Sequence, residues 1–191
     1  MPATSEQRLI EIVQRSAWLM PALRAVRALA LDSWCIGAGA LRDTVWDALY
    51  GCADARLPRD VDVAYFDPSD TSRARDHALQ QQLHAYMPQL PWEVVNQAGV
   101  HLWFEGVFGH PAAPLASLEE AVASWPETAT AVGITLDTAD RLRVIAPLGL
   151  ADLFDGIVRR NSMRVSVATY RQRCATKQYT ARWPQVRVLP A

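Results

Sequence analysis

The chain has 191 residues, of which 50% are hydrophobic and 20% are charged. This length suits one well-buried core and is too short for two ordinary domains. Nineteen basic and 20 acidic side chains give a formal net charge of −1, which excludes a protein that binds nucleic acid with its whole surface. Since no apolar run approaches the roughly 18–20 residues of a membrane helix and the N-terminus lacks a signal pattern, we expect a cytoplasmic protein with no membrane or DNA partner.

Hydrophobic periodicity and turn residues predict the elements in chain order. The first half is predicted to contain helices at 5–16 (with Ser5 as N-cap) and 20–31, a strand at 34–36, a helix at 40–50, a loop at 52–59, a strand at 60–66, a helix at 71–87 and a strand at 92–96. The second half is predicted to contain helices at 100–108 and 117–125 (opened by a capping box), a hairpin of strands 132–136 and 142–145, and helices at 148–154 and 165–181. Strands interleaved with helices indicate an α/β or α+β fold with a mixed sheet.

The charge is unevenly distributed along the chain. Residues 156–191 contain eight basic and no acidic side chains, so residues 1–155 carry 11 basic and 20 acidic ones, a balance of −9. Such asymmetry indicates either an anion-binding tail docked on an acidic body or a solvated basic helix. Lys177 is the only lysine in the chain, which makes it a candidate for a position that needs an ammonium group.

A glycine turn at 37–39, with the sequence Gly-Ala-Gly, joins a predicted strand to a predicted helix. Glycine lets phosphate oxygens approach backbone N–H groups closely, and a helix N-terminus adds a favourable dipole for an anion. Taken alone, such a turn is usually only a tight connection. It becomes a candidate phosphate cradle only if the next strand of the chain brings metal-binding groups beside it.

Asp60 and Asp62 lie 21 and 23 residues after Gly39, in a run that alternates Asp-Val-Asp-Val. The two-residue period of a strand puts both carboxylates on one face, where they repel unless a cation or a shared proton intervenes. Hard oxygen ligands suit Mg²⁺ or Mn²⁺, which bridge carboxylates and substrate phosphates. A phosphate cradle beside a dicarboxylate is the arrangement that metal-dependent nucleotidyl transfer requires. A solvated pair on an edge strand is the plainer interpretation of Asp-x-Asp alone.

Together these motifs resemble a known superfamily. The segment from Ile36 to Asp43, with Asp60-Val61-Asp62-Val63, resembles the signature of the DNA polymerase β-like nucleotidyltransferases, and its Gly-Ala-Leu-Arg-Asp portion is similar to that of tRNA CCA-adding enzymes. Over most of residues 30–155 the chain resembles more closely a bacterial family of small nucleotidyltransferases. The segments that carry this likeness are 38–42, 45–47, 60–67, 92–98, 125–129, 146–150 and 177–184.

The resemblance implies a polymerase β-like core over about residues 30–155, a mixed sheet flanked by helices, with helical additions at both ends. Residues 1–191 would then form a single domain, with the basic segment 156–191 as its C-terminal addition. The resemblance also implies a third carboxylate on a neighbouring strand, where Glu93 is best placed, although aspartate is commoner there. Such a group helps to hold the metal and draws the proton from the attacking hydroxyl. Ala38-Gly39 replaces the usual Gly-Gly or Gly-Ser, and alanine is small enough for us to expect the cradle to survive.

We therefore predict a Mg²⁺-dependent (or Mn²⁺-dependent) nucleotidyltransferase that moves an NMP from an NTP to an acceptor hydroxyl and releases pyrophosphate. The predicted catalytic and metal-binding residues are Asp60, Asp62 and Glu93, and the predicted nucleotide-binding residues are Gly37, Ala38, Gly39, Arg42 and Lys177. Pairing of Arg42 with Asp43, Asp47 or Asp60 is equally compatible with its place in the chain. The acceptor stays open between a small molecule, a protein and an RNA end.

Two other functions compete with this prediction. A catalytically silent module on the same fold would sense a nucleotide or bind a protein, but three retained carboxylates argue against it. An RNA-modifying enzyme akin to the CCA-adding group would have only one basic helix outside the core with which to grip RNA.

Two further segments have a functional and a structural interpretation. Asn96 and Gln97, after the strand at 92–96, either contact a base or ribose or hydrogen-bond the backbone locally. The segment from Trp125 to Thr128 either lines the pocket or forms a helix terminus.

Overall fold

The structure is a computed structural model that describes residues 3–52 and 57–191. Its helices are α1 (Ser5–Arg15), α2 (Leu19–Arg27), α3 (Ala38–Tyr50), α4 (Arg73–Tyr86), α5 (His101–Phe108), α6 (Leu118–Ala123), α7 (Ala151–Phe154), α8 (Val167–Lys177) and α9 (Tyr179–Arg182), with 3₁₀ turns η1 (Gln97–Gly99) and η2 (Thr128–Thr130). Its strands are β1 (Trp34–Gly37), β2 (Val61–Tyr65), β3 (Trp92–Asn96), β4 (Gly133–Leu136), β5 (Leu142–Ile145), β6 (Ile157–Val158) and β7 (Arg187–Val188). Residues 53–56 of the predicted loop at 52–59 lie outside the described residues.

The main sheet has the strand order β3-β2-β1-β4-β5. β2 and β3 run parallel, and α4 connects them because parallel neighbours need a crossover. The remaining pairs are antiparallel, including the hairpin β4–β5, whose register joins Gly133 to Ile145. The prediction of a mixed sheet flanked by helices is confirmed.

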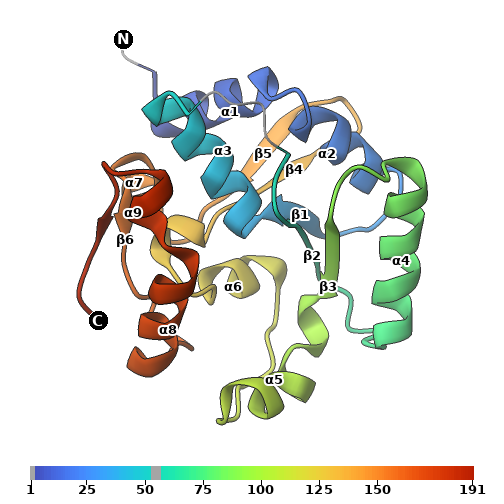
Figure 1. Cartoon of the computed structure of the whole chain (residues 1–191). Coiled ribbons are helices and arrows are strands. Elements are labelled where there is room, and N and C mark those ends of the chain that lie inside the picture. Colours follow the sequence, from blue (N-terminus) through green and yellow to red (C-terminus); the bar gives the residue numbers. More distant parts are fainter. Residues whose placement is uncertain (1–2, 53–56) are drawn as a thin grey trace.

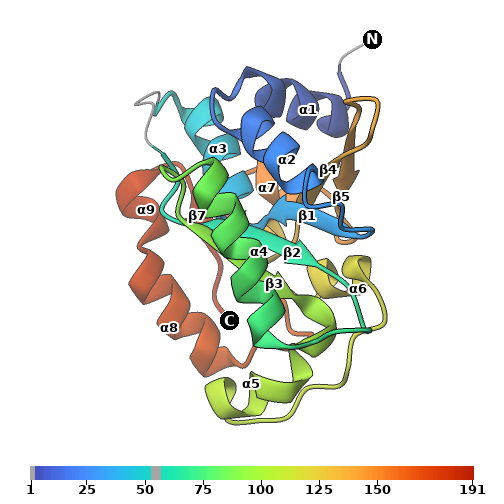
Figure 2. The same cartoon turned by 90° about the vertical axis from the view of Figure 1, so that its right-hand side faces the viewer.

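The two faces of this sheet have different environments. Strand alternation sends Ile36, Val63 and Val94 into the large core, which helices α1 to α4 cover (Figures 1 and 2). The opposite face carries Cys35 and Ala64, which pack against residues of α6. Asp62 and Glu93 leave the sheet on that second face, because they alternate with the core residues. The second face therefore holds the cleft that contains the candidate site.

Several details of the predicted helices are wrong. The N-cap of α1 is Thr4 rather than Ser5, because Thr4 and Gln7 form a reciprocal capping box. Ser117 does cap α6, but Glu120 accepts the N–H of Ala116 instead of that of Ser117, and the helix ends before Trp125.

A further error concerns the predicted helix at 165–181, which is divided at Gln178. This residue has a φ of +47° in the left-handed region. The turn ends α8 at Lys177 and lets the next residue, Tyr179, pack edge-on against Trp46 at a centroid distance of 6.1 Å. Burial of this tyrosine offsets the conformational cost of the left-handed residue.

The basic C-terminal segment docks on the acidic body. Four of its eight cations form ion pairs with the first 155 residues, namely Arg159 with Asp152, Arg173 with Glu127, Lys177 with Asp60, and Arg182 with Asp43 and Asp47. Among the described residues, no helix has both the length and the apolar composition needed to cross a membrane.

Candidate active site

The glycine turn forms the end of β1 and the start of α3. A side chain at Gly37 would place a Cβ 2.6 Å from the carbonyl oxygen of Val132 and 2.7 Å from Cζ3 of Trp125, so only glycine fits there. Ala38 follows with a φ of +50°, a left-handed conformation that costs a non-glycine residue about 1–2 kcal/mol. The turn expected from the sequence is therefore formed, with alanine in a strained position. Gly37 lies behind the cleft, whereas Ala38 and Gly39 line it.

Asp60 and Asp62 meet directly above this turn. An added Cβ on Gly39 would lie 3.5 Å from Oδ1 of Asp60 and 3.9 Å from Oδ2 of Asp62, so the two carboxylates face the same point over the helix N-terminus. Asp60 immediately precedes β2, and Asp62 is its second residue. The backbone N–H of Gly39 lies close enough to the carboxylate of Asp62 to favour its charged form.

Burial and neighbouring charge perturb Asp62. Burial, together with the negative charges of Asp60 and Glu93, raises the pKa of Asp62 to about 6 against the opposing effects of Lys177 and the Gly39 N–H. A carboxyl group with such a raised pKa in a cleft is typical of a functional site. Asp62 therefore has strong electrostatic affinity for a cation.

Glu93 completes the group of carboxylates. It pairs in register with Asp62 across the parallel strands β3 and β2, so both side chains leave the same face of the sheet. Within the described residues, no three His, Cys, Asp or Glu side chains are grouped closely enough to hold a metal ion by themselves. One or two carboxylates suffice for Mg²⁺ when substrate phosphates and water supply the other ligands, and the hard oxygen donors of Asp60 and Asp62 fit that requirement.

Arg42 is buried beside the cradle and already has a partner. Its Nε and Nη2 donate to Oδ1 of Asp43 at 3.1 and 2.6 Å, and its guanidinium lies over the rings of Trp46 and Tyr179. Of the three aspartates predicted as alternative partners of Arg42, the structure pairs it with Asp43. Arg42 still lines the cleft.

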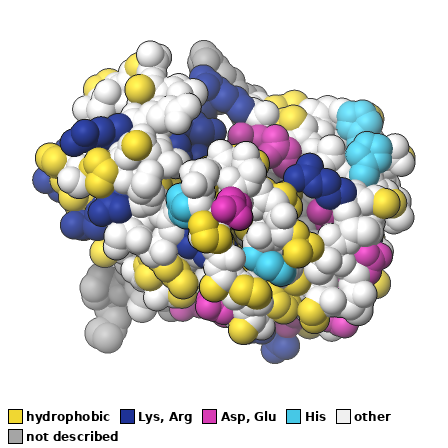
Figure 3. All heavy atoms as spheres, turned by 90° about the horizontal axis from the view of Figure 1, so that it is seen from below, with side chains coloured by type: hydrophobic (Ala, Val, Ile, Leu, Met, Phe, Trp, Pro, Cys, Tyr) yellow, Lys and Arg dark blue, Asp and Glu magenta, His cyan; other side chains and the backbone are white. Residues whose placement is uncertain are grey.

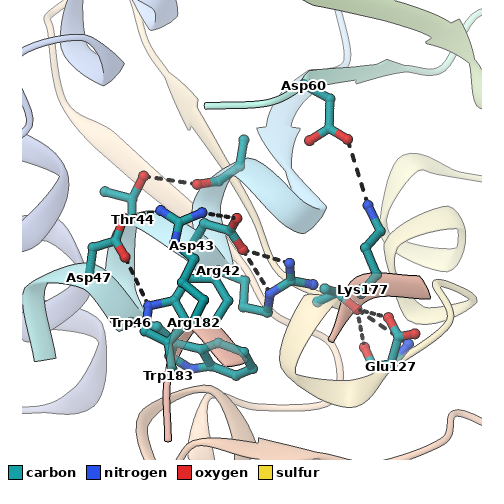
Figure 4. A network of polar contacts seen from close by, with 12 residues as sticks. Arg42, Asp43, Thr44, Trp46, Asp47, Asp60, Glu127, Lys177, Arg182 and Trp183 are labelled. Carbon is teal, nitrogen blue, oxygen red and sulfur yellow. Dashed lines mark hydrogen bonds and ion pairs between the residues drawn. The ribbon is translucent and has the colours of Figure 1, made fainter. Parts of the chain in front are cut away.

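Lys177 reaches the carboxylates from the far side. Its Nζ lies 3.8 Å from Oδ2 of Asp60, and Figure 4 shows the two side chains pointing toward each other from the end of α8 and the start of β2. The left-handed residue Gln178 ends α8 at this lysine. A segment distant in sequence thus supplies a cation to the cleft.

Arg173 is a cleft residue that the sequence did not reveal. Its Nε and Nη2 donate to Glu127 at 2.7 and 3.1 Å, and Glu127 is only 1% exposed. Burial alone would raise the pKa of Glu127, but the bonds from Arg173 and Thr130 outweigh it and hold that pKa below its usual value. The position of Arg173 four residues before Lys177 on one helix was the available signal, since such residues share a face.

The remaining candidates divide between structure and cleft. Asn96 is buried and bonds the backbone around Asp67 and Asp70, so the structural interpretation holds for it. Gln97 donates to the carbonyl of Val95 and also lines the cleft, together with Trp125 and Pro126.

These elements enclose one cleft of about 300 Å³. It brings together seven of the eight predicted site residues, namely Ala38, Gly39, Arg42, Asp60, Asp62, Glu93 and Lys177, and adds Arg173. Three carboxylates and three cationic side chains thus line one cavity that begins at a helix N-terminus.

A family model described as nucleotidyltransferase matches residues 24–188. This chain belongs to the nucleotidyltransferase family. The match spans the sheet, the cleft and the C-terminal helices, so it covers every candidate site residue. A comparison with curated proteins finds no match.

Solved structures agree with this membership in the nucleotidyltransferase family. One similar structure, an NMR structure reported to reveal a CCA-adding enzyme head domain, has a TM-score of 0.82 and 27% sequence identity, covering 97% of this chain and 96% of that one. A second, a CCA-adding enzyme in complex with CTP, has a TM-score of 0.57 and 11% identity, covering 98% of this chain. The nucleotidyltransferase chain spans only 43% of that enzyme, and at this identity the likeness concerns the fold alone.

Proposed function

We propose that this nucleotidyltransferase is a Mg²⁺-dependent enzyme, formed by residues 1–191 as one domain, that transfers an NMP from an NTP to an acceptor hydroxyl and releases pyrophosphate. One observation carries the proposal: the carboxylates of Asp60 and Asp62 face a common point above the glycine turn that begins α3. Phosphate and carboxylate groups can approach each other there only with cations between them. The relative solved with CTP belongs to the same fold and supports an NTP as the substrate.

Asp60 and Asp62 would hold the divalent cation, with phosphate oxygens and water completing its ligands. Such a cation, when bound, neutralises charge on the phosphates and lowers the pKa of the attacking hydroxyl. The N–H of Gly39 and the dipole at the start of α3 would bind phosphate oxygens, whereas the N–H of Ala38 already donates to the carbonyl of Val132. Lys177 and Arg173 would offset the negative charge that develops on the pyrophosphate.

Glu93 would accept the proton of the acceptor hydroxyl. The acceptor oxygen bonds to the α-phosphorus while the bond from that phosphorus to the bridging oxygen breaks. Pyrophosphate then leaves with the electron pair of the broken bond, and the proton goes to Glu93 and on to water. Glu93 is exposed and lies beside Asp62, which suits a base that exchanges protons with solvent.

The test is label transfer from NTPs labelled at the α-phosphate. Purified protein, Mg²⁺ and acceptors of different classes are expected to give a labelled adduct and an equal amount of pyrophosphate. Asp62→Asn is expected to abolish both, whereas Asp32→Asn, which changes an aspartate before β1 and outside the cleft, leaves them unchanged. Metal-dependent NTP binding without transfer to any acceptor would favour a nucleotide-sensing module instead.

A further inference from the structure

A second cavity opens beside the cleft. It has a volume of about 230 Å³ and shares Val95, Gln97, Trp125 and Pro126 with the cleft. Its other walls come from α5 and from the chain entering α8. The two cavities therefore adjoin, with these four residues between them.

The second cavity is apolar, unlike the cleft. Eight of its twelve lining residues are apolar, and four of these are the aromatic residues Trp103, Phe104, Phe108 and Trp125. Phe104 and Phe108 lie with ring centroids 4.4 Å apart. Figure 3 views the molecule from the end where α5 lies and shows apolar side chains interleaved with charged ones there. Such walls suit a flat apolar ring, which gains both burial and ring contacts.

Among the twelve lining residues, all within the described ranges, Arg164 is the one charged side chain. Its guanidinium lies 5.8 Å from the centre of the Phe104 ring and donates to the carbonyl of Ala113. Burial lowers the pKa of Arg164. A nucleic-acid end needs several cations for its phosphates, so this cavity matches an uncharged group better than an RNA terminus.

The apolar cavity lies at the side of the cleft formed by β3, the strand that carries Glu93. The strands β1, β2 and β3 are neighbours in that order across the sheet. The glycine turn follows β1, Asp62 is on β2, and Glu93 is on β3. Val95 comes two residues after Glu93, so the two side chains share a face, and Val95 borders both cavities. A ring held in the apolar cavity would point its substituent past Val95 toward Glu93.

We propose that this cavity binds the acceptor, and that the acceptor is an uncharged small molecule with one or two aromatic rings and a hydroxyl group. The proposal rests on the proposed function, because it assigns the second substrate of that same reaction. A cavity of about 150 Å³ lined by apolar side chains admits benzene, so the larger volume found here accommodates a substituted or fused ring. The hydroxyl becomes the oxygen that bonds to the α-phosphorus, with pyrophosphate leaving and the proton passing to Glu93.

The test uses 1-naphthol, a two-ring phenol, as the probe of the 191-residue protein. Thr169→Trp fills the cavity from the first turns of α8, while the Thr169 backbone N–H keeps its bond to Ser166. Trp103→Ala instead removes a half-buried ring from its wall. Leu102→Ala is the matched control, because Leu102 is on the same helix, is 67% exposed and does not line the cavity.

Calorimetry is expected to show saturable naphthol binding that Thr169→Trp weakens by about tenfold or more and Trp103→Ala by about fivefold. Leu102→Ala and Asp62→Asn are expected to leave it within about twofold. Binding of Mg²⁺ and NTP to Thr169→Trp stays unchanged, which shows that this variant is folded and that the nucleotide site is separate.

Two results would overturn the proposal. One is absence of saturable naphthol binding, or binding that Thr169→Trp and Trp103→Ala leave unchanged. The other is loss of NTP affinity in Thr169→Trp with displacement of naphthol by NTP, which would place the nucleobase in the cavity. Failure of the proposed function is a different observation, namely that no NTP binds to the wild-type protein while naphthol binding persists.

Discussion

Asp62 and Glu93 occupy paired positions on the parallel strands β2 and β3, and both carboxylates leave the same face of the sheet. Asp60 adds a third negative charge at the start of β2, and burial of Asp62 makes the repulsion more costly. Bringing these like charges together on folding is unfavourable, and a cation bound between them would relieve the repulsion.

The raised pKa of Asp62 predicts how stability depends on pH. Because the folded-state pKa of about 6 exceeds the usual value of 3.8, ionisation of Asp62 destabilises the folded state. This penalty is absent below about pH 4 and complete above about pH 6. Asp62→Asn is expected to raise the free energy of unfolding by about 1–3 kcal/mol at pH 7.5 and by much less at pH 4. Urea titrations of both proteins at the two pH values measure it, and a destabilised variant at pH 7.5 would contradict the account.

The glycine turn predicts that one glycine-to-alanine substitution lowers stability and that another lowers nucleotide affinity. Gly37→Ala forces a Cβ against Val132 and Trp125, and is expected to destabilise the protein by about 1–3 kcal/mol. Gly39→Ala finds only ordinary contact distances, so folding persists, but the methyl group occupies the space below Asp60 and Asp62. NTP affinity is expected to fall about tenfold in this variant. Thermal melts with nucleotide titrations separate the two effects, and unchanged NTP affinity in Gly39→Ala would remove the cradle from the site.

The pair of Glu127 and Arg173 is expected to matter for stability. Glu127→Gln removes the negative charge of a side chain that is only 1% exposed. The Arg173 guanidinium, which is 31% exposed, then lacks its bidentate carboxylate acceptor. Glu127→Gln is therefore expected to cost about 2–4 kcal/mol of unfolding free energy. Glu119→Gln is the control, because Glu119 and Arg143 form an exposed pair at 3.8 Å whose loss should cost less than about 0.5 kcal/mol. Equal effects in denaturant titrations would show that the buried pair has no special role.

Lys177 is expected to act on the nucleotide and on Asp62 together. Lys177→Met keeps most of the side-chain length but removes a charge that lowers the Asp62 pKa. We expect NTP affinity to fall about five- to tenfold at low salt, and the pH midpoint of nucleotide binding to move upward. Arg171→Met, at an exposed position on the same helix, should change neither quantity. Identical binding and pH profiles for Lys177→Met and wild type would exclude Lys177 from the site.

The sequence predicts the parts of the site that lie close together along the chain. The alternation around Asp60 and Asp62 and the turn before α3 are local patterns, and their physical consequences can be deduced without coordinates. The left-handed residue at Gln178 was not predictable, because it depends on Tyr179 packing against Trp46 from a distant helix. The position of Arg173 four residues before Lys177 could have indicated a cleft residue, but its pairing with Glu127, 46 residues earlier, is not a local pattern.

The apolar cavity could not be predicted from the sequence either. Its lining residues come from four separate segments, at 95–108, 124–126, 164–165 and 169, and each ring alone is indistinguishable from an ordinary core residue. Only the three-dimensional arrangement places these rings beside the strand that carries Glu93.

Calorimetric titration of each NTP, with and without Mg²⁺, tests the central claim most directly. The account predicts binding of at least one NTP that requires Mg²⁺, and its loss in both Asp60→Asn and Asp62→Asn while both variants remain folded. Asp32→Asn should bind like the wild type. Binding that is independent of Mg²⁺, or that persists in both aspartate variants, would contradict the assignment of these two carboxylates to the nucleotide site.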